Sequence, residues 1–380
     1  MALTERIGVP RDTLPTFASA ISALPTSALQ YLLLDPGHGM PPPSLTDSFS
    51  SLVLRCGPSI TEFVCLTPLS DAATSHLVHL PHLRYWTIID PPPNYSTSSL
   101  PLPTSFPPLT QFRLGGDGVR GWISLFGCLA ASVPGVQGGM PLSRVRESLE
   151  TLDIINYPNS ITNLSLISPI QIFHNLAFLN VEVSCHDRDG DDRCSFELND
   201  DNAAELAMAL PHMCVLRLGR PCFKNTCATT VACLLQISVY CLELESLEIH
   251  FNTRNVVEDF KSISMDPRFE QLRSLPRCSL SCLEVSRAPL ALDKPGFETV
   301  ANGMVDIFPS IERCKGFEGA WDDVSGRISK LRALNMLWVS VCFRLPLHLT
   351  HSRATGEPVK GYSISRDTMA GWIGPHNHFL

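Results

Sequence analysis

A short pattern of apolar and polar positions recurs along most of the chain. An apolar residue is followed by two variable positions and then by two apolar residues on either side of one other residue, as in LESLEI from Leu244. Several copies carry a proline two places earlier, as in PHLRYWTI from Pro81 and PHMCVLRL from Pro211. A spacing of 23 to 40 residues between successive copies indicates an irregular internal repeat. The ten copies begin at residues 29, 60, 83, 109, 149, 176, 213, 244, 280 and 311.

The second half of each copy predicts a short β-strand. Side chains alternate between the two faces of a strand, so the residues three and five places after each start share one face. In the copy that begins at residue 149, Leu152 and Ile154 share that face and Asp153 points the other way. A core does not accept an unpaired carboxylate. We therefore expect the first face to be buried and the second face to meet solvent.

The segments between the copies have helical features. Residues 201–210 are expected to form a short helix, with Asp200 or Asp201 as its N-cap and with Pro211 ending it. Other helices of this kind are expected at residues 70–80, 121–132, 226–240 and 296–308.

A single strand and helix cannot bury its own apolar side, so successive units must stack. The pattern therefore predicts an α/β solenoid over residues 1–320, with about ten units. We expect a curved, horseshoe-shaped molecule with parallel strands on the concave face and helices outside. Residues 321–380 lack the repeat and are expected to form a weakly structured or disordered tail.

One copy also resembles a known family signature. LESLEIHFN, from Leu244 to Asn252, resembles the leucine-rich-repeat signature LxxLxLxxN. Cys241, three places earlier, is similar to the cysteine-containing repeat type of F-box proteins, and the long irregular units resemble those of fungal F-box/leucine-rich-repeat proteins. The resemblance covers roughly Leu24 to Gly319 and implies a leucine-rich-repeat fold. Most copies lack the asparagine, so we expect irregular turns where that family has an asparagine ladder.

The resemblance also implies a role. In that family an N-terminal F-box docks onto a Skp-type adaptor of an SCF-type ubiquitin ligase, and the repeats capture the substrate. An F-box opens with Leu-Pro followed by Glu, whereas Leu14-Pro15 and Leu24-Pro25 are each followed by Thr. We expect this sequence to lack the F-box and to bind a Skp-type adaptor only if an F-box lies upstream. The expected function is that of a protein-protein interaction module, with substrate recognition for the ligase as its specific form.

Composition narrows the class of partner. The chain has 29 Lys and Arg against 37 Asp and Glu, a net charge of −8, which argues against binding to nucleic acid or to an anionic membrane surface. No apolar stretch approaches the roughly 20 residues of a membrane helix, and the first twelve residues lack the apolar core of a signal peptide. Fourteen cysteines without a CxxC pair favour reduced, buried thiols. These features predict an intracellular protein, cytoplasmic or nuclear.

A glycine motif offers an alternative function. Gly116, Gly118 and Gly121 form GxGxxG between a predicted strand and a predicted helix, the context of a dinucleotide-binding oxidoreductase. The acidic residue that binds the ribose about 20 residues later is missing near Pro141. We favour a turn of the repeat at this motif and expect no cofactor.

Three candidate metal sites are weak. The acidic run at 187–192 lacks the glycine and glutamate of a calcium loop. His76, His79 and His82 are spaced by three residues, but Pro81 interrupts the helix that would align them. The third candidate group is Cys185, His186 and Cys194. Because no catalytic motif is present either, we expect neither a metal site nor an enzyme.

The solvent-facing strand positions are the candidate binding surface. The first units place Leu33, Val64 and Thr87 there, and later units place charged residues, so we expect an apolar zone and a charged zone that confers specificity. Tyr31 is a further possible anchor. The Pro/Ser-rich segment 90–108 is expected to be extended, either as an inert insertion or beside this surface. The residues expected to contact a partner are Tyr85, Arg113, Asp153, Phe178, Asn180, Arg217, Glu248, His250 and Glu284.

Overall fold

The computed structural model divides the chain into two compact units, residues 1–329 and residues 330–380. All the strands described below belong to the first unit. The structure describes residues 29–35, 43–89, 107–116, 145–156, 170–183, 198–220, 228–285, 290, 292–316 and 319–334.

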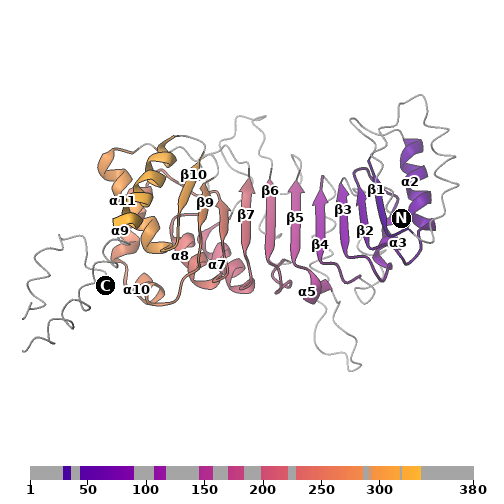
Figure 1. Ribbon diagram of the computed structural model, residues 1–380, viewed down its shortest axis with the longest axis horizontal. Coiled ribbons are helices and arrows are strands. Elements are labelled where there is room, and N and C mark those ends of the chain that lie inside the picture. The colour runs from indigo at the N-terminus through magenta and orange to yellow at the C-terminus, as the bar shows by residue number, and fades with distance from the viewer. Residues whose placement is uncertain are drawn as a thin grey trace, which may run out of the picture. The chain divides into compact units, whose positions relative to one another are not determined.

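Ten parallel strands form one sheet in which each strand lies beside its neighbour in the sequence (Figure 1). Every strand begins two residues after a start of the repeat, which confirms the ten predicted strands. Even the degenerate copy at Ile311 forms a strand. The strands are β1 (Tyr31–Leu34), β2 (Glu62–Cys65), β3 (Tyr85–Ile89), β4 (Gln111–Gly115), β5 (Thr151–Asn156), β6 (Phe178–Val183), β7 (Val215–Arg220), β8 (Ser246–Ile249), β9 (Cys282–Val285) and β10 (Arg313–Gly316).

This strand order decides which face of the sheet carries the connections. Crossovers between parallel strands are right-handed in nearly all proteins, so connections that always advance to the next strand lie on one face. The α/β class and the single parallel sheet are thus confirmed, while the horseshoe curvature and the concave position of the strands stay predictions. The helices are α2 (Pro43–Arg55), α3 (Asp71–Val78), α5 (Val145–Ser148), α7 (Asp200–Ala209), α8 (Ala232–Tyr240), α9 (Val256–Met265), α10 (Pro267–Ser274) and α11 (Lys294–Ile307).

The proline of the repeat lies in a tight turn before the strand. The backbone N–H of Leu83 donates to the carbonyl of Leu80 at 3.4 Å, and Met213 donates to Leu210 in the same way at 3.2 Å. Pro81 and Pro211 therefore occupy the second position of a four-residue turn, where the fixed φ of proline is favourable.

A shared backbone acceptor then sets the start of each strand. The carbonyl of Gln30 accepts hydrogen bonds from the N–H groups of Thr61 (2.8 Å) and Glu62 (3.1 Å). The same arrangement recurs at every junction from β1 to β10, which fixes a common register along the whole sheet. The other acceptors are the carbonyls of Thr61, Arg84, Thr110, Glu150, Ala177, Cys214, Glu245 and Ser281.

Two rows of apolar side chains form the core on the helix-covered face. In β5, Leu152 and Ile154 are both fully buried, as the alternation predicts. Large side chains stack between neighbouring strands, and the rings of Trp86 and Phe112 lie with their centroids 5.2 Å apart. Burying each such side chain contributes about 1.5–3 kcal/mol, so this face supplies most of the stability of the sheet.

The helix caps differ in one place from the sequence prediction. The side chain of Asn199, rather than that of Asp200 or Asp201, caps α7 by accepting from the N–H of Asn202 at 2.9 Å. Asp200 instead accepts from the N–H of Thr230 at 2.7 Å and so ties α7 to the segment before α8. The sequence could not reveal this long-range partner, which draws the carboxylate away from the helix end.

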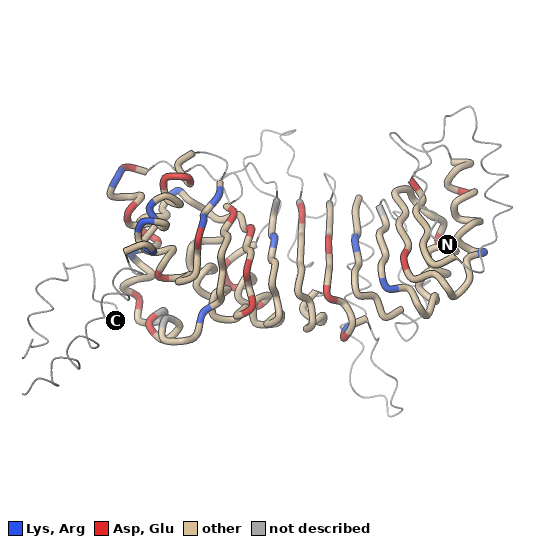
Figure 2. Tube along the Cα trace, viewed as in Figure 1, with Lys and Arg blue, Asp and Glu red and all other residues tan. Residues whose placement is uncertain are grey.

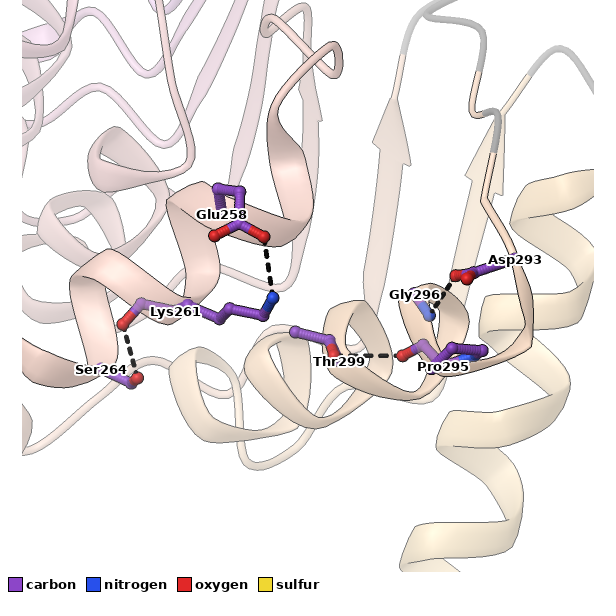
Figure 3. Close-up of polar contacts among 7 residues, drawn as sticks. All are labelled: Glu258, Lys261, Ser264, Asp293, Pro295, Gly296 and Thr299. Atoms are coloured by element: carbon purple, nitrogen blue, oxygen red, sulfur yellow. Dashed lines mark hydrogen bonds and ion pairs between the residues drawn. The ribbon is translucent and has the colours of Figure 1, made fainter.

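The helix α11 begins with a regular cap. Asp293 accepts from the N–H of Gly296 at 2.9 Å, and the Thr299 hydroxyl donates to the carbonyl of Pro295 at 3.1 Å (Figure 3). Four predicted helices thus lie at α3, α7, α8 and α11, while the helix expected at residues 121–132 lies outside the described residues.

The prediction for the C-terminal segment needs correction at its start. Residues 320–334 form a helix rather than a weakly structured tail, and Trp321 in this helix is fully buried. Its ring packs edge-on against Phe251 at 6.3 Å and lies directly over Gly316 at the end of β10. An unrecognised aromatic contact, not a repeat, holds this helix, which is why the repeat pattern missed it.

Candidate interaction surface on the sheet

The face of the sheet that carries no connections is called the open face here. The residues four places after each repeat start form one continuous row on it, because each is in register with the next across the sheet. Along this row uncharged residues come first and, apart from Asn180, charged residues follow. It runs Leu33, Val64, Thr87, Arg113, Asp153, Asn180, Arg217, Glu248, Glu284 and Lys315.

The first strands contribute the apolar zone. Tyr31 and Tyr85 lie in a second row of the same face, each in register with Glu62 between them. Thr87 is buried and its hydroxyl donates to the phenol oxygen of Tyr85 at 3.3 Å. The hydrogen bond holds this tyrosine against the sheet, so its ring forms a preset apolar surface.

Ion pairs and hydrogen bonds connect β4, β5 and β6 across the open face. Arg113 Nε lies 3.1 Å from Asp153 Oδ2, and the amide nitrogen Nδ2 of Asn180 donates to Asp153 Oδ1 at 2.8 Å. One carboxylate thus receives a charged donor from one neighbouring strand and a neutral donor from the other. This pairing explains how an acidic residue is accepted in the middle of a sheet.

A second set of contacts is centred on Arg217 in β7. Its guanidinium lies 5.6 Å from the centre of the Phe178 ring, and its Nε lies 3.8 Å from Glu248 Oε2. The Arg217 side chain is 39% exposed and that of Glu248 only 4%. On this row β4 and β7 therefore each carry a positive residue and β5 and β8 each a negative one, and Figure 2 shows both blue and red segments on the middle strands.

The expectation that this whole face meets solvent is wrong at three of the expected contact residues. Asn180 and Glu248 are 8% and 3% exposed, and His250, just beyond β8, is 5% exposed. Side chains on parallel strands stand about 4.8 Å apart and can cover one another once their charges are paired. Sequence reasoning treated each position alone and so missed this mutual burial.

The structure places further exposed residues on the open face that the prediction omitted. Gln111, Arg313 and Lys315 lie on the open face and are exposed. The repeat spacing alone could have identified two of them, because Gln111 lies two places after the repeat start at 109 and Lys315 lies four places after the start at 311. The remaining expected residues, Tyr85, Phe178 and Glu284, lie on this face as predicted.

The signature residues of the repeat have structural roles. Asn252 accepts from the N–H of Arg254 at 3.0 Å, so it forms a local turn, while its own N–H donates to Thr229 at 2.9 Å. The Cys241 thiol lies 3.6 Å from the carbonyl of Ala207 in the preceding unit. Burial raises the pKa of this thiol to about 12, so it is neutral and unreactive near pH 7.

The other cysteines that the structure describes are also free, and most are buried. Burial raises the pKa of Cys65 and of Cys314 to about 12. This agrees with the prediction of reduced thiols that serve as small apolar side chains.

The glycine motif is only partly described. Gly116 has a positive φ of 87° and its N–H donates to the carbonyl of Ile155 at 3.0 Å, so it ends β4 in a turn held by β5. Gly118, Gly121 and the acidic run at 187–192 lie outside the described residues. Doubly wound sheets bind dinucleotides where the strand order reverses. The order from β1 to β10 has no such reversal.

Two histidines of the candidate group form hydrogen bonds with backbone carbonyls and do not converge on a common site. His76 Nε2 lies 3.0 Å from the carbonyl of Cys56, and His79 Nδ1 lies 2.6 Å from that of Ser75. The part of the chain that the structure describes contains no group of His, Cys, Asp and Glu that could hold a metal ion. Cys185, His186 and Cys194 fall outside it.

Comparisons with known proteins leave this surface as the main guide to function. No family model matches the chain, and no curated protein matches it either. Among the described helices, none is long and apolar enough to cross a membrane.

Proposed function

We propose that the chain is a protein-protein interaction module that binds a polypeptide across the open face of its sheet. The observation that carries the proposal is a row of aligned, varied side chains on ten strands, opposite a face that is buried throughout. Tyr85 and Phe178 would act as aromatic anchors, and Arg113 and Glu284 would select the partner. A broad polypeptide suits such a surface because it needs no deep pocket.

A more specific form of the proposal is substrate recognition for an SCF-type ubiquitin ligase. Its support is the resemblance of LESLEIHFN and Cys241 to the repeats of F-box/leucine-rich-repeat proteins. A Skp-type adaptor would take part only through an F-box upstream of the sequence. Co-purification of such an adaptor with the protein produced from its own genomic locus tests this form, and its absence would leave only the general interaction module.

No observation on the described residues specifically supports the alternative of a dinucleotide-binding oxidoreductase. Specific binding of a cofactor would stabilise the native state and raise Tm. We expect NAD and NADP at millimolar concentration to leave Tm unchanged in a thermal-shift assay. A saturable rise with either cofactor would contradict this and would restore the glycine motif as a site.

A matched pair of charge reversals tests the general proposal. Arg113 is 44% exposed and paired with a carboxylate on the open face. Lys261 is 49% exposed and paired with Glu258 on α9, a connecting helix (Figure 3). Arg113→Glu and Lys261→Glu therefore change the charge equally and each breaks one ion pair.

We expect partners that co-purify with the wild type to be lost or reduced at least tenfold with Arg113→Glu and retained with Lys261→Glu, as for a charge that lies in the interface. Thermal unfolding of both variants controls for folding. Equal recovery of the same partners with both variants would reject the open face as the binding surface.

A further inference from the structure

Asn180 lies in the middle of the open face, and the oxygen of its side-chain amide accepts no hydrogen bond from the described residues. Its Nδ2 donates to Asp153 at 2.8 Å, but its Oδ1 has no hydrogen-bond partner among the described residues, and the residue is 8% exposed. A buried acceptor left without a donor costs about 1–3 kcal/mol. Such an atom at the centre of a proposed binding surface indicates a donor that the partner supplies.

The surroundings of Asn180 favour a positively charged donor. Asp153 adjoins it, and Glu182 lies two residues along β6, so that both side chains share the open face. From β4 to β8 the described side chains in this region include three carboxylates, Asp153, Glu182 and Glu248, against the guanidinium groups of Arg113 and Arg217. Both guanidinium groups are already paired with carboxylates.

The whole chain carries a net charge of −8, which attracts a basic partner over a distance. A single carbonyl oxygen suits the compact ammonium of lysine better than the planar fork of arginine.

The side chain that we expect to cover this oxygen is that of Arg217 on the neighbouring strand. Arg217 is in register with Asn180 and is anchored by a ring contact at 5.6 Å and an ion pair at 3.8 Å. The ring contact contributes about 0.5–1 kcal/mol at an exposed site. The ion pair is long at 3.8 Å, but moving Arg217 leaves the buried Glu248 carboxylate without this partner, a role that the ammonium of a lysine would take over. An exposed side chain such as that of Arg217 changes rotamer within nanoseconds.

We propose that Asn180 Oδ1 accepts a hydrogen bond from a lysine side chain of the bound polypeptide, and that Arg217 swings away to admit it. This inference rests on the proposed function, since it names the chemistry that the open face selects. It makes Asn180 the acceptor, Asp153 the residue that orients the amide, and Arg217 a movable cover.

Three labelled peptides of twelve residues test the inference directly. Serine alternates in them with lysine, with glutamine or with glutamate, and binding is followed by fluorescence anisotropy at fixed ionic strength. We expect the lysine peptide to bind best. Asn180→Leu should weaken its binding roughly tenfold, the size of one hydrogen bond to a charged group, whereas Thr299→Val on the connecting helix α11 should not change it.

The cover residue provides a second readout. Arg217→Ala should tighten binding of the lysine peptide several-fold, and the gain should vanish in the double variant Asn180→Leu/Arg217→Ala. A gain that persists in the double variant would reflect the lost positive charge alone and would overturn the role of Asn180. Asn180→Ala serves in place of Asn180→Leu if the latter unfolds at a lower temperature than the wild type.

Two further outcomes would overturn the inference. Equal binding of the glutamine and lysine peptides would mean that a neutral donor suffices. Unchanged binding of the lysine peptide to Asn180→Leu would place the contact elsewhere. Neither outcome affects the charge-reversal test of Arg113, so failure of the lysine site is distinguishable from failure of the open face as an interaction surface.

Discussion

In one buried row of the helix-covered face, five neighbouring strands repeat the same side chain, whereas in the adjoining row of the open face the same strands differ. Leucine occupies one buried position on five consecutive strands, from Leu152 in β5 to Leu283 in β9. One residue further along, on the open face, the same strands carry Asp, Asn, Arg, Glu and Glu. Packing needs matched shapes in every unit, so it constrains the first face alone. The open face is free to vary and therefore to encode a partner.

The largest expected effect on the free energy of unfolding comes from truncating one buried side chain on the helix-covered face. Leu179 is fully buried in β6. Leu179→Ala should lower the free energy of unfolding by about 2–5 kcal/mol, through lost burial and the cavity that remains. Thr151→Ala, on the open face of β5, should change it by less than about 1 kcal/mol. Urea unfolding measures both, and equal losses would contradict the division between the faces.

Two glycines in the helices distinguish a closely packed position from an open one. A Cβ built on Gly303 in α11 would lie 2.2 Å from the Phe260 ring of α9, whereas one on Gly326 in the helix 320–334 meets nothing within 4 Å. Gly303→Ala should destabilise by about 1–3 kcal/mol through overpacking. Gly326→Ala should stabilise by up to about 1 kcal/mol because alanine favours a helix. A stabilising Gly303→Ala would show that these two helices are not in close contact.

The smallest effect is expected from the ion pair of Arg217 and Glu248. Their separation of 3.8 Å and the 39% exposure of Arg217 point to a coupling free energy of about 0–1 kcal/mol. A double-mutant cycle with Arg217→Gln and Glu248→Gln, followed by thermal unfolding, gives this coupling free energy separately from the cost of burying Glu248. A coupling well above 1 kcal/mol would make Arg217 a fixed part of the fold and not a movable cover.

The sequence predicted the strands well because one local rule governs all of them. A turn, a shared backbone acceptor and two buried positions recur within eight residues, so even the degenerate copy at Ile311 was identified. The helix at 320–334 was missed because its main anchor, the contact of Trp321 with Phe251 and Gly316, has no repeated counterpart.

The candidate surface was predicted in its location but not in its chemistry. The alternation placed Arg113, Asp153, Asn180 and Arg217 on one face correctly. Their pairing across strands depends on which side chains lie opposite one another and how long they are. That information comes from the register of the folded sheet, so the burial of Asn180 could not be foreseen from spacing.

Site-specific photo-cross-linking tests the central claim most directly. Benzoylphenylalanine replaces Gln111, which is exposed on the open face, or Met208, which is 51% exposed on α7. Light-induced adducts with a partner protein in cell extract should form from position 111 and not from position 208. Adducts from position 208 alone would contradict the account and would assign the interaction to the helices instead.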